Sequence, residues 1–160
     1  MKNNETEKIN LKELTVEIPY KWRVQSYSKN KPSCSCVAYI DARDVMDMLD
    51  AVVGPQNWQD NYEVVHNQLV ASIGIKVDGE WIWKKDTGTE SQTEKEKGIF
   101  SDSFKRAAVK WGIGRFLYNL DIVYLKANEI KKDNTWPYPI DNSGQRIWDV
   151  TDHINRMNSK

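Results

Sequence analysis

The hydrophobic pattern of the chain changes from helical to strand-like and back to helical between residues 41 and 122. Residues 41–53 place an apolar side chain at every third or fourth position, which predicts an amphipathic helix. Asp41 is the predicted N-cap of this helix, and Gly54-Pro55 is expected to end it.

Three strand-like runs follow, at residues 61–67, 68–77 and 80–87. The middle run alternates apolar and other residues, as does a strand with one buried face. Asp78-Gly79, between the second and third runs, is a strong signal for a two-residue hairpin. These runs predict a three-stranded antiparallel sheet.

A second helix is predicted after a polar loop at residues 87–95. Read at helical period, its apolar residues form one narrow stripe made of Phe100, Phe104, Ala107 and Trp111. Arg106 and Lys110, one turn apart, lie on the opposite side, and Lys105 lies on the flank. Gly112 and Gly114 are expected to end the helix. A cationic ridge of this kind suits a phosphate backbone, although every amphipathic helix needs a polar face.

The fold class predicted from this order is α+β: helix, three-stranded antiparallel sheet, helix, with short extra N- and C-terminal elements. The flanking segments are predicted to be a short helix at residues 9–14, an extended run at 20–25, a polar loop at 26–35 and a short amphipathic segment at 148–157. Three parts are expected along the chain: a disordered tail at 1–8, the main domain at 9–125, and an extension at 126–160 that packs on the same domain.

Charge is balanced overall but unevenly placed. The chain has 23 Lys and Arg residues against 23 Asp and Glu residues. Residues 41–66 hold six acids and Arg43 as the one base, whereas residues 84–115 hold eight basic and five acidic residues. One protomer can therefore present an anionic and a cationic surface, which permits head-to-tail assembly into a ring.

The sequence does not support catalysis, a metal site or a membrane span. The two cysteines are one residue apart with no second pair at zinc-site spacing, and no phosphate loop or Ser-His constellation can be read. Glu90, Glu94 and Glu96 could gather near Asp86 to bind magnesium. This interpretation is weaker than the alternative, in which these residues are solvated acids of a loop and a helix cap. Without a leader or a long apolar run, a cytoplasmic protein with reduced thiols and no cofactor is expected.

Four motifs in this order resemble the Rad52 family of DNA single-strand annealing proteins, and more closely the Sak-type annealing proteins of bacteriophages. They are Val37-Ala-Tyr-Ile-Asp-Ala-Arg-Asp-Val-Met46, Gly54-Pro-Gln-Asn-Trp58, Asp86-Thr-Gly-Thr89 and Ser101-Asp-Ser-Phe-Lys-Arg-Ala-Ala-Val-Lys-Trp-Gly112. The resemblance covers about residues 35–122.

The resemblance implies a closed homo-oligomeric ring with single-stranded DNA in a cationic groove. It also implies annealing of complementary strands in recombination and repair without ATP. A single-stranded-DNA-binding protein is a further partner to expect, and a phage-encoded chain would act in the cytoplasm of its bacterial host.

By the same resemblance, Lys105 and Arg106 match the family's Lys-Arg pair on the DNA backbone, whereas Trp58 and Asp86-Thr-Gly88 are expected to be structural. The family's basic residue near the start of the first helix falls on Asp44, which leaves Arg43 as the nearest replacement. A third basic position falls on Val109, beside Lys110.

Backbone contacts carry no sequence information and therefore suit annealing of any sequence. The cations expected to contact DNA are Lys105, Arg106, Lys110, Arg115, Arg43, Lys84, Lys85 and Lys97. The aromatic candidates for base stacking are Trp22, Trp81, Trp83, Tyr118 and Tyr124. Trp81 and Trp83 rank first because they share one face of their strand, with Lys84 beside them. Most Trp and Tyr residues of a small domain nevertheless belong to its core or interfaces.

Two other functions stay open at this point. A double-stranded RNA-binding module also runs helix, three strands, helix, with a basic second helix. A non-catalytic scaffold that assembles or binds a partner protein would fit the same charge pattern. Size in solution distinguishes an RNA-binding module, which would be a monomer, from a ring. Loss of DNA binding with retained assembly would indicate the scaffold.

Overall fold

The structure is a computed structural model that describes residues 8–89, 95–129 and 136–160; the side chains of 95–97 lie outside it. Within those residues it has three α-helices and two antiparallel sheets, so the predicted α+β class is confirmed. The contacts divide into two compact units. The first unit comprises the described residues of Met1–Ile18 and Ile40–Phe116, and the second those of Pro19–Tyr39 and Leu117–Lys160.

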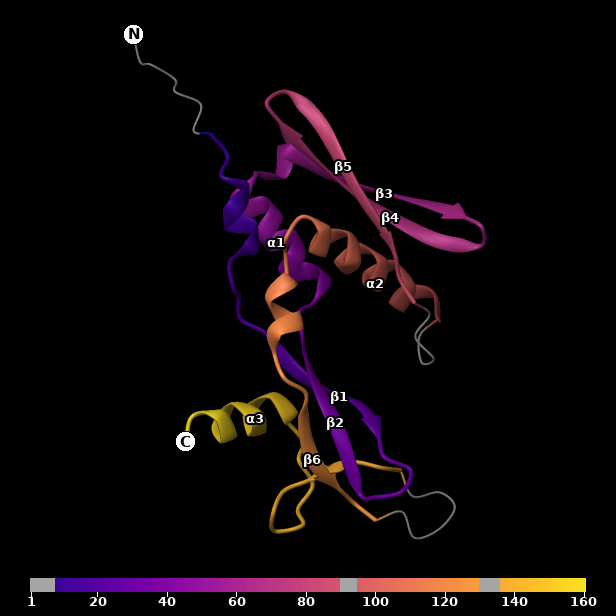
Figure 1. Cartoon of the computed structure of the whole chain (residues 1–160), viewed down its shortest axis with the longest axis vertical. Coiled ribbons are helices and arrows are strands. Elements are labelled where there is room, and N and C mark those ends of the chain that lie inside the picture. Colours follow the sequence, from indigo (N-terminus) through magenta and orange to yellow (C-terminus); the bar gives the residue numbers. More distant parts are fainter. Residues whose placement is uncertain (1–7, 90–94, 130–135) are drawn as a thin grey trace. The chain divides into compact units, whose positions relative to one another are not determined.

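The first unit contains the predicted helix, three strands, helix core (Figure 1). Its elements are the 3-10 helix η1 (Leu11–Thr15), α1 (Ala42–Val52), the 3-10 helix η2 (Pro55–Asn57), β3 (Trp58–Val65), β4 (Gln68–Val77), β5 (Glu80–Thr87) and α2 (Lys95–Lys110). Its sheet has the order β3-β4-β5. The central order expected from the hydrophobic pattern is confirmed.

The first helix begins and ends as its sequence predicts. Asp41 is the N-cap of α1, and its backbone N–H donates to Asp44 Oδ2 at 2.7 Å. Val45 and Leu49 are buried on one side of α1. Gly54 follows the helix with φ at 88°, a conformation that glycine adopts without a steric penalty.

Two tight turns join the three strands. Asp78 and Gly79 have φ of 50° and 84° between β4 and β5, as expected for a hairpin with two positive φ values. His66 and Asn67, with φ of 49° and 61°, make an equivalent turn between β3 and β4. This second turn could not be predicted from the sequence, because His-Asn is a weaker signal for a two-residue turn than Asp-Gly.

The three-stranded sheet has a helix-side face and an open face. Residues that pair directly across neighbouring strands have their side chains on the same face of the sheet. One row across the three strands is Asp60, Ile73 and Lys84. The next row, on the opposite face, is Asn61, Ser72 and Lys85. Helix α2 packs along β4 and β5 (Figure 1). The side that carries Ile73 and Lys84 is the helix-side face, because the Lys84 side chain donates to the Lys110 carbonyl at the end of α2.

The apolar stripe of α2 is confirmed except at its first position. Phe104, Ala107 and Ala108 are buried, and Trp111 is half-buried. Phe100 is 47% exposed, and its ring contacts that of Tyr62 on β3 with the centroids 5.1 Å apart. Gly112 follows the helix with φ at 101°, where a Cβ would lie 2.6 Å from Thr15 Cγ2.

The second unit is built on a sheet that the sequence analysis did not predict. Its elements are β1 (Lys21–Tyr27), β2 (Ser33–Tyr39), β6 (Val123–Ala127), β7 (Pro139–Ile140) and α3 (Val150–Asn158), and the strand order is β1-β2-β6-β7. Residues 33–35, expected in a polar loop, belong to β2. Cys34 pairs with Leu125 across the β2-β6 ladder. The two units therefore interleave along the chain, which differs from the expected division at residue 125.

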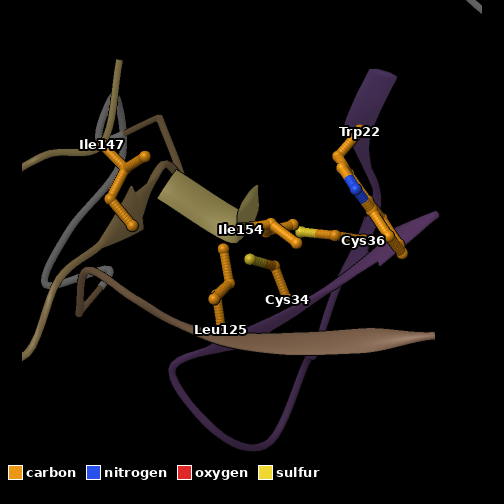
Figure 2. Packing of buried hydrophobic residues seen from close by; sticks show 6 residues of the cluster. All are labelled: Trp22, Cys34, Cys36, Leu125, Ile147 and Ile154. Atoms are coloured by element: carbon orange, nitrogen blue, oxygen red, sulfur yellow. The ribbon is translucent and has the colours of Figure 1, made fainter. Parts of the chain in front are cut away.

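The core of the second unit lies between its sheet and α3. Figure 2 shows it, with Ile154 of α3 beside the two cysteines. The buried residues are Trp22, Cys34, Cys36, Leu125, Ile147 and Ile154. Trp22 is only 6% exposed, so its candidacy for base stacking is wrong.

The structure also bears on the question of a membrane span. Among the described residues, no helix combines the length and apolar character needed to cross a bilayer.

Candidate nucleic-acid interface

Four of the predicted cations lie at the C-terminal end of α2 and on the adjoining edge strand β5, and they are here called the cationic cluster: Lys84, Lys85, Lys110 and Arg115. Three of them meet at the helix end, whereas the Lys85 side chain lies on the open face of β5 and only its carbonyl accepts from Lys110 Nζ. Arg115 Nη2 donates to the Val109 carbonyl at 2.8 Å, and Lys84 Nζ donates to the Lys110 carbonyl at 3.4 Å. Carbonyls in the last turn of a helix lack intrahelical partners and carry the negative end of its dipole. The cluster therefore forms where the backbone itself attracts cations.

Two carboxylates lie beside the cluster without neutralising it. Lys85 Nζ is 3.7 Å from Glu63 Oε1, and Lys110 Nζ is 4.0 Å from Asp86 Oδ2. The Lys85 and Lys110 side chains are 66% and 49% exposed, so these pairs stay hydrated and weak. Four cations against two carboxylates leave a positive surface that a phosphate can reach.

Lys84 is positioned by the aromatic side chain beneath it. Its Nζ lies 4.8 Å from the centroid of the Trp111 ring, and Trp111 Nε1 donates to the Ile73 carbonyl at 3.0 Å. Lys84 therefore belongs to the helix-side face. The expectation that it lies beside Trp81 and Trp83 is wrong, because adjacent residues of a strand point to opposite faces.

The Lys-Arg pair of α2 is half-buried and already bonded. Lys105 Nζ donates to the Ile40 carbonyl at 3.3 Å. Arg106 Nε donates at 3.1 Å to Asp102 Oδ2, which also accepts from the Thr89 backbone N–H at 2.9 Å. The Arg106 side chain is 41% exposed, so it can meet a ligand while it stays paired.

The Asp86-Thr-Gly88 motif ties β5 to α2. The Gly88 backbone N–H donates to Ser103 Oγ at 2.9 Å, and a Cβ at Gly88 would lie only 2.7 Å from that oxygen. Trp58 donates from Nε1 to Asp50 Oδ1 at 2.7 Å and packs near Phe104. The structure thus gives the motif and Trp58 structural positions.

Arg43 and Lys97 do not join the cationic cluster. Arg43 is exposed on α1 and has no hydrogen bond or ion pair among the described residues. Asp44, at the position where the family carries a base, completes the N-cap of α1 instead. Lys97 lies in the first turn of α2, and its side chain is outside the described part of the chain.

The candidate magnesium ligands Glu90, Glu94 and Glu96 also fall outside the described side chains. Across the side chains that are described, no three His, Cys, Asp or Glu residues gather as metal ligands would.

Trp81 and Trp83 lie together on the open face of the sheet. They are 39% and 44% exposed, and their ring centroids are 6.4 Å apart. Lys85 shares this face with them. The sequence analysis missed their polar neighbours Gln59, Asn61 and Ser72, which only the register of three strands brings together.

Comparison with known proteins identifies a family that fits this arrangement. Residues 72–137 match the family described as "Rad52/22 family double-strand break repair protein". The cationic cluster and both candidate stacking residues lie within this range. This segment of the chain is therefore similar to the Rad52/22 family.

The chain is also homologous to two proteins named single-stranded DNA-binding protein DdrA. It is 32% identical to the protein from Deinococcus deserti over 118 residues, which cover 72% of this chain and 58% of the relative. It is 34% identical to that from Deinococcus radiodurans over 101 residues, which cover 62% and 48%. The chain spans about half the length of these curated relatives.

Proposed function

We propose that this chain binds single-stranded DNA and anneals complementary strands, without ATP, in recombination and repair of DNA. The observation that carries the proposal is the cationic cluster at the C-terminal end of α2, which lies inside the segment matched by the Rad52/22 family. The two homologues named as single-stranded DNA-binding proteins support the same ligand. The motif order of residues 35–122 supports the narrower phage Sak type.

The geometry suits a grip on phosphates rather than on bases. The cluster has ammonium and guanidinium groups held on backbone carbonyls, so their positions are fixed before DNA arrives. Contacts to phosphates position a strand and carry no sequence information, which annealing of arbitrary sequences requires. The bases of nucleotides that are held by this cluster are left to pair with the complementary strand.

Self-association into a ring belongs to the same proposal. Within the described residues, β3 and β5 each have one neighbour in the three-stranded sheet, so each leaves one edge to another chain. Head-to-tail contact between unlike surfaces closes into a ring when the rotation between protomers allows it. Light scattering at micromolar concentration tests this part, and a stable monomer would contradict it.

The test of the proposed function combines binding and annealing. Fluorescence anisotropy with a labelled mixed-sequence oligonucleotide measures binding, and mixing with its complement measures annealing. Lys85→Ala with Lys110→Ala should weaken binding and flatten its dependence on log salt by roughly 0.7 per lost phosphate contact. Lys126→Ala, which removes an exposed lysine of the second unit, is the matched control.

Three results would contradict the proposal. They are tighter binding of double-stranded RNA than of single-stranded DNA, binding without faster annealing, and an unchanged salt dependence in the double variant.

A further inference from the structure

The open face of the β3-β4-β5 sheet carries two adjacent rows of residues with the chemistry of base recognition. Gln59, Gly74 and Trp83 form one row across the three strands, and Asn61, Ser72 and Lys85 form the next. The two rows thus offer two amides, a hydroxyl, an indole and an ammonium group, but no carboxylate.

A cavity of about 420 Å³ lies on these rows. It is lined by Gln59, Asp60, Asn61, Ser72, Trp83 and Lys85. Asp60 belongs to a helix-side row, and its carboxylate accepts from the Tyr62 hydroxyl at 3.0 Å. Lys85 is therefore the charged side chain that the open face contributes to the lining, and Glu63 of the same face lies 3.7 Å from its Nζ. Because the Lys85 side chain is 66% exposed, this pair is weak and leaves the ammonium able to meet a phosphate.

Gly74 accounts for the position of the Trp83 indole, which lines one side of the cavity. A Cβ at Gly74 would lie 2.9 Å from three atoms of the Trp83 ring, so the indole occupies the space left by the missing side chain. The glycine fixes Trp83 across the middle strand, with the cavity beside it. Trp81 extends the same aromatic surface by one row.

Ser72 contributes a hydroxyl to the lining of this cavity. The residue is 7% exposed, but its oxygen is not among the buried side-chain atoms that lack a partner, so water can reach it from the cavity. The hydroxyl is therefore able to exchange that water for the polar edge of a ligand.

We propose that this cavity is a base-binding subsite for single-stranded DNA. One unstacked nucleobase lies against the Trp83 indole, with its polar edge toward Gln59, Asn61 and Ser72 and its phosphate toward Lys85. Aromatic side chains on open sheet faces bind single strands in this way, and amides and hydroxyls pair with base edges. The inference rests on the proposed function and adds a base contact to it.

The subsite and the cationic cluster meet at the edge strand β5. Lys84 points to the helix side and Lys85 to the open side, although the two residues are adjacent. A strand that crosses this edge can leave phosphates on the cluster and place a base in the cavity. A second copy of the chain is the competing occupant, but the ammonium group of Lys85 suits it less well, because the cores of protein interfaces are depleted in charged residues.

The experiment compares two labelled oligonucleotides of equal length and charge, one with bases and one made of abasic sites. The full-length wild type should prefer the strand with bases. Trp83→Ala should reduce that preference roughly tenfold and leave affinity for the abasic strand unchanged. Ile82→Ala is the control, because it truncates an equally exposed apolar neighbour on the opposite face of β5.

Two further variants distinguish a base contact from a structural role. Gly74→Ala keeps the indole but displaces it, and it should lower the preference as Trp83→Ala does. Ser72→Ala should leave thermal stability nearly unchanged, because the hydroxyl faces a water-accessible cavity, yet it should reduce the preference several-fold.

An unchanged preference in Trp83→Ala would overturn the inference. The inference would also be overturned if Trp83→Ala lost affinity equally for both oligonucleotides and formed a smaller particle in light scattering. That result would assign the open face to contact with a second copy of the chain. If the wild type binds neither oligonucleotide, the proposed function itself fails.

Discussion

Arg115 closes the end of α2 by donating to the Val109 carbonyl through both Nε and Nη2, at 3.2 and 2.8 Å. The same nitrogen, Nη2, is 3.2 Å from the Lys110 carbonyl. A planar guanidinium can hold two carbonyls and still face solvent with its remaining donors. One residue thereby stabilises the helix and contributes charge to the cationic cluster.

Arg115→Ala should therefore lower stability and DNA affinity together. We expect a loss of about 1 kcal/mol in the free energy of unfolding, because solvent partly replaces the lost donors at this exposed site. Arg115→Lys should restore most of the affinity but not all of the stability, because an ammonium lacks the guanidinium fork. Urea denaturation and oligonucleotide binding measure the two effects. Full stability in Arg115→Ala would contradict the capping role.

Arg106 and Arg156 offer a matched pair of substitutions. Arg106 Nε is 3.1 Å from Asp102 Oδ2 on α2, and Arg156 Nε is 3.0 Å from Asp152 Oδ2 on α3, with the same spacing of four residues. Both pairs are open to solvent, so removing either should cost less than about 1 kcal/mol of stability. We expect Arg106→Ala, but not Arg156→Ala, to reduce the salt dependence of DNA binding. Equal effects of the two variants would show that position on α2 does not matter.

The first unit could be predicted from the sequence because its signals are local. An N-cap at Asp41, a hairpin at Asp78-Gly79 and the helical spacing before Gly112 each act within a few residues. The second unit could not be predicted in the same way. Pairing of Cys34 with Leu125 joins segments far apart in the chain, and no local turn signal encodes it.

For the candidate site, residue type was easier to predict than direction. The cations on and just after α2 could be identified from the sequence. Two of them, Lys110 and Arg115, lie at the C-terminal end of the helix. Lys84, expected beside Trp81 and Trp83, points toward Trp111 instead, and Lys85 shares the open face with the two tryptophans. Ser72 carried no signal of its own, because its place in the cavity comes from the pairing of three strands.

The buried thiols predict a stability that falls at alkaline pH. Burial, reinforced by Cys34, raises the pKa of Cys36 from 9.0 to about 12. In the unfolded chain the thiol loses its proton near its ordinary pKa, whereas the folded chain keeps it. The stabilisation is therefore complete below pH 9 and is lost as the pH rises toward 12, by about 1.4 kcal/mol per pH unit for one thiol.

Urea denaturation between pH 8 and pH 11 measures this slope. Cys36→Ala should be less stable at neutral pH because it leaves a cavity, but its stability should fall less steeply above pH 9. The difference between the two slopes isolates the thiol from tyrosines and lysines that titrate nearby. Parallel slopes would show that Cys36 ionises at its ordinary pKa.

The last prediction concerns the source of free energy for annealing. Two complementary strands gain stacking worth about 1.4 kcal/mol per base-pair step, which is enough to drive pairing without a cofactor. The protein has only to hold the strands and reduce the repulsion between their phosphates, for which the cationic cluster is suited. Annealing should therefore proceed without ATP and should be unchanged by a chelator when ionic strength is held constant. A labelled complementary pair followed with and without chelator measures this, and Lys85→Ala with Lys110→Ala serves as the slow control. Annealing that stops on chelation and resumes with magnesium alone would show that a metal ion takes part.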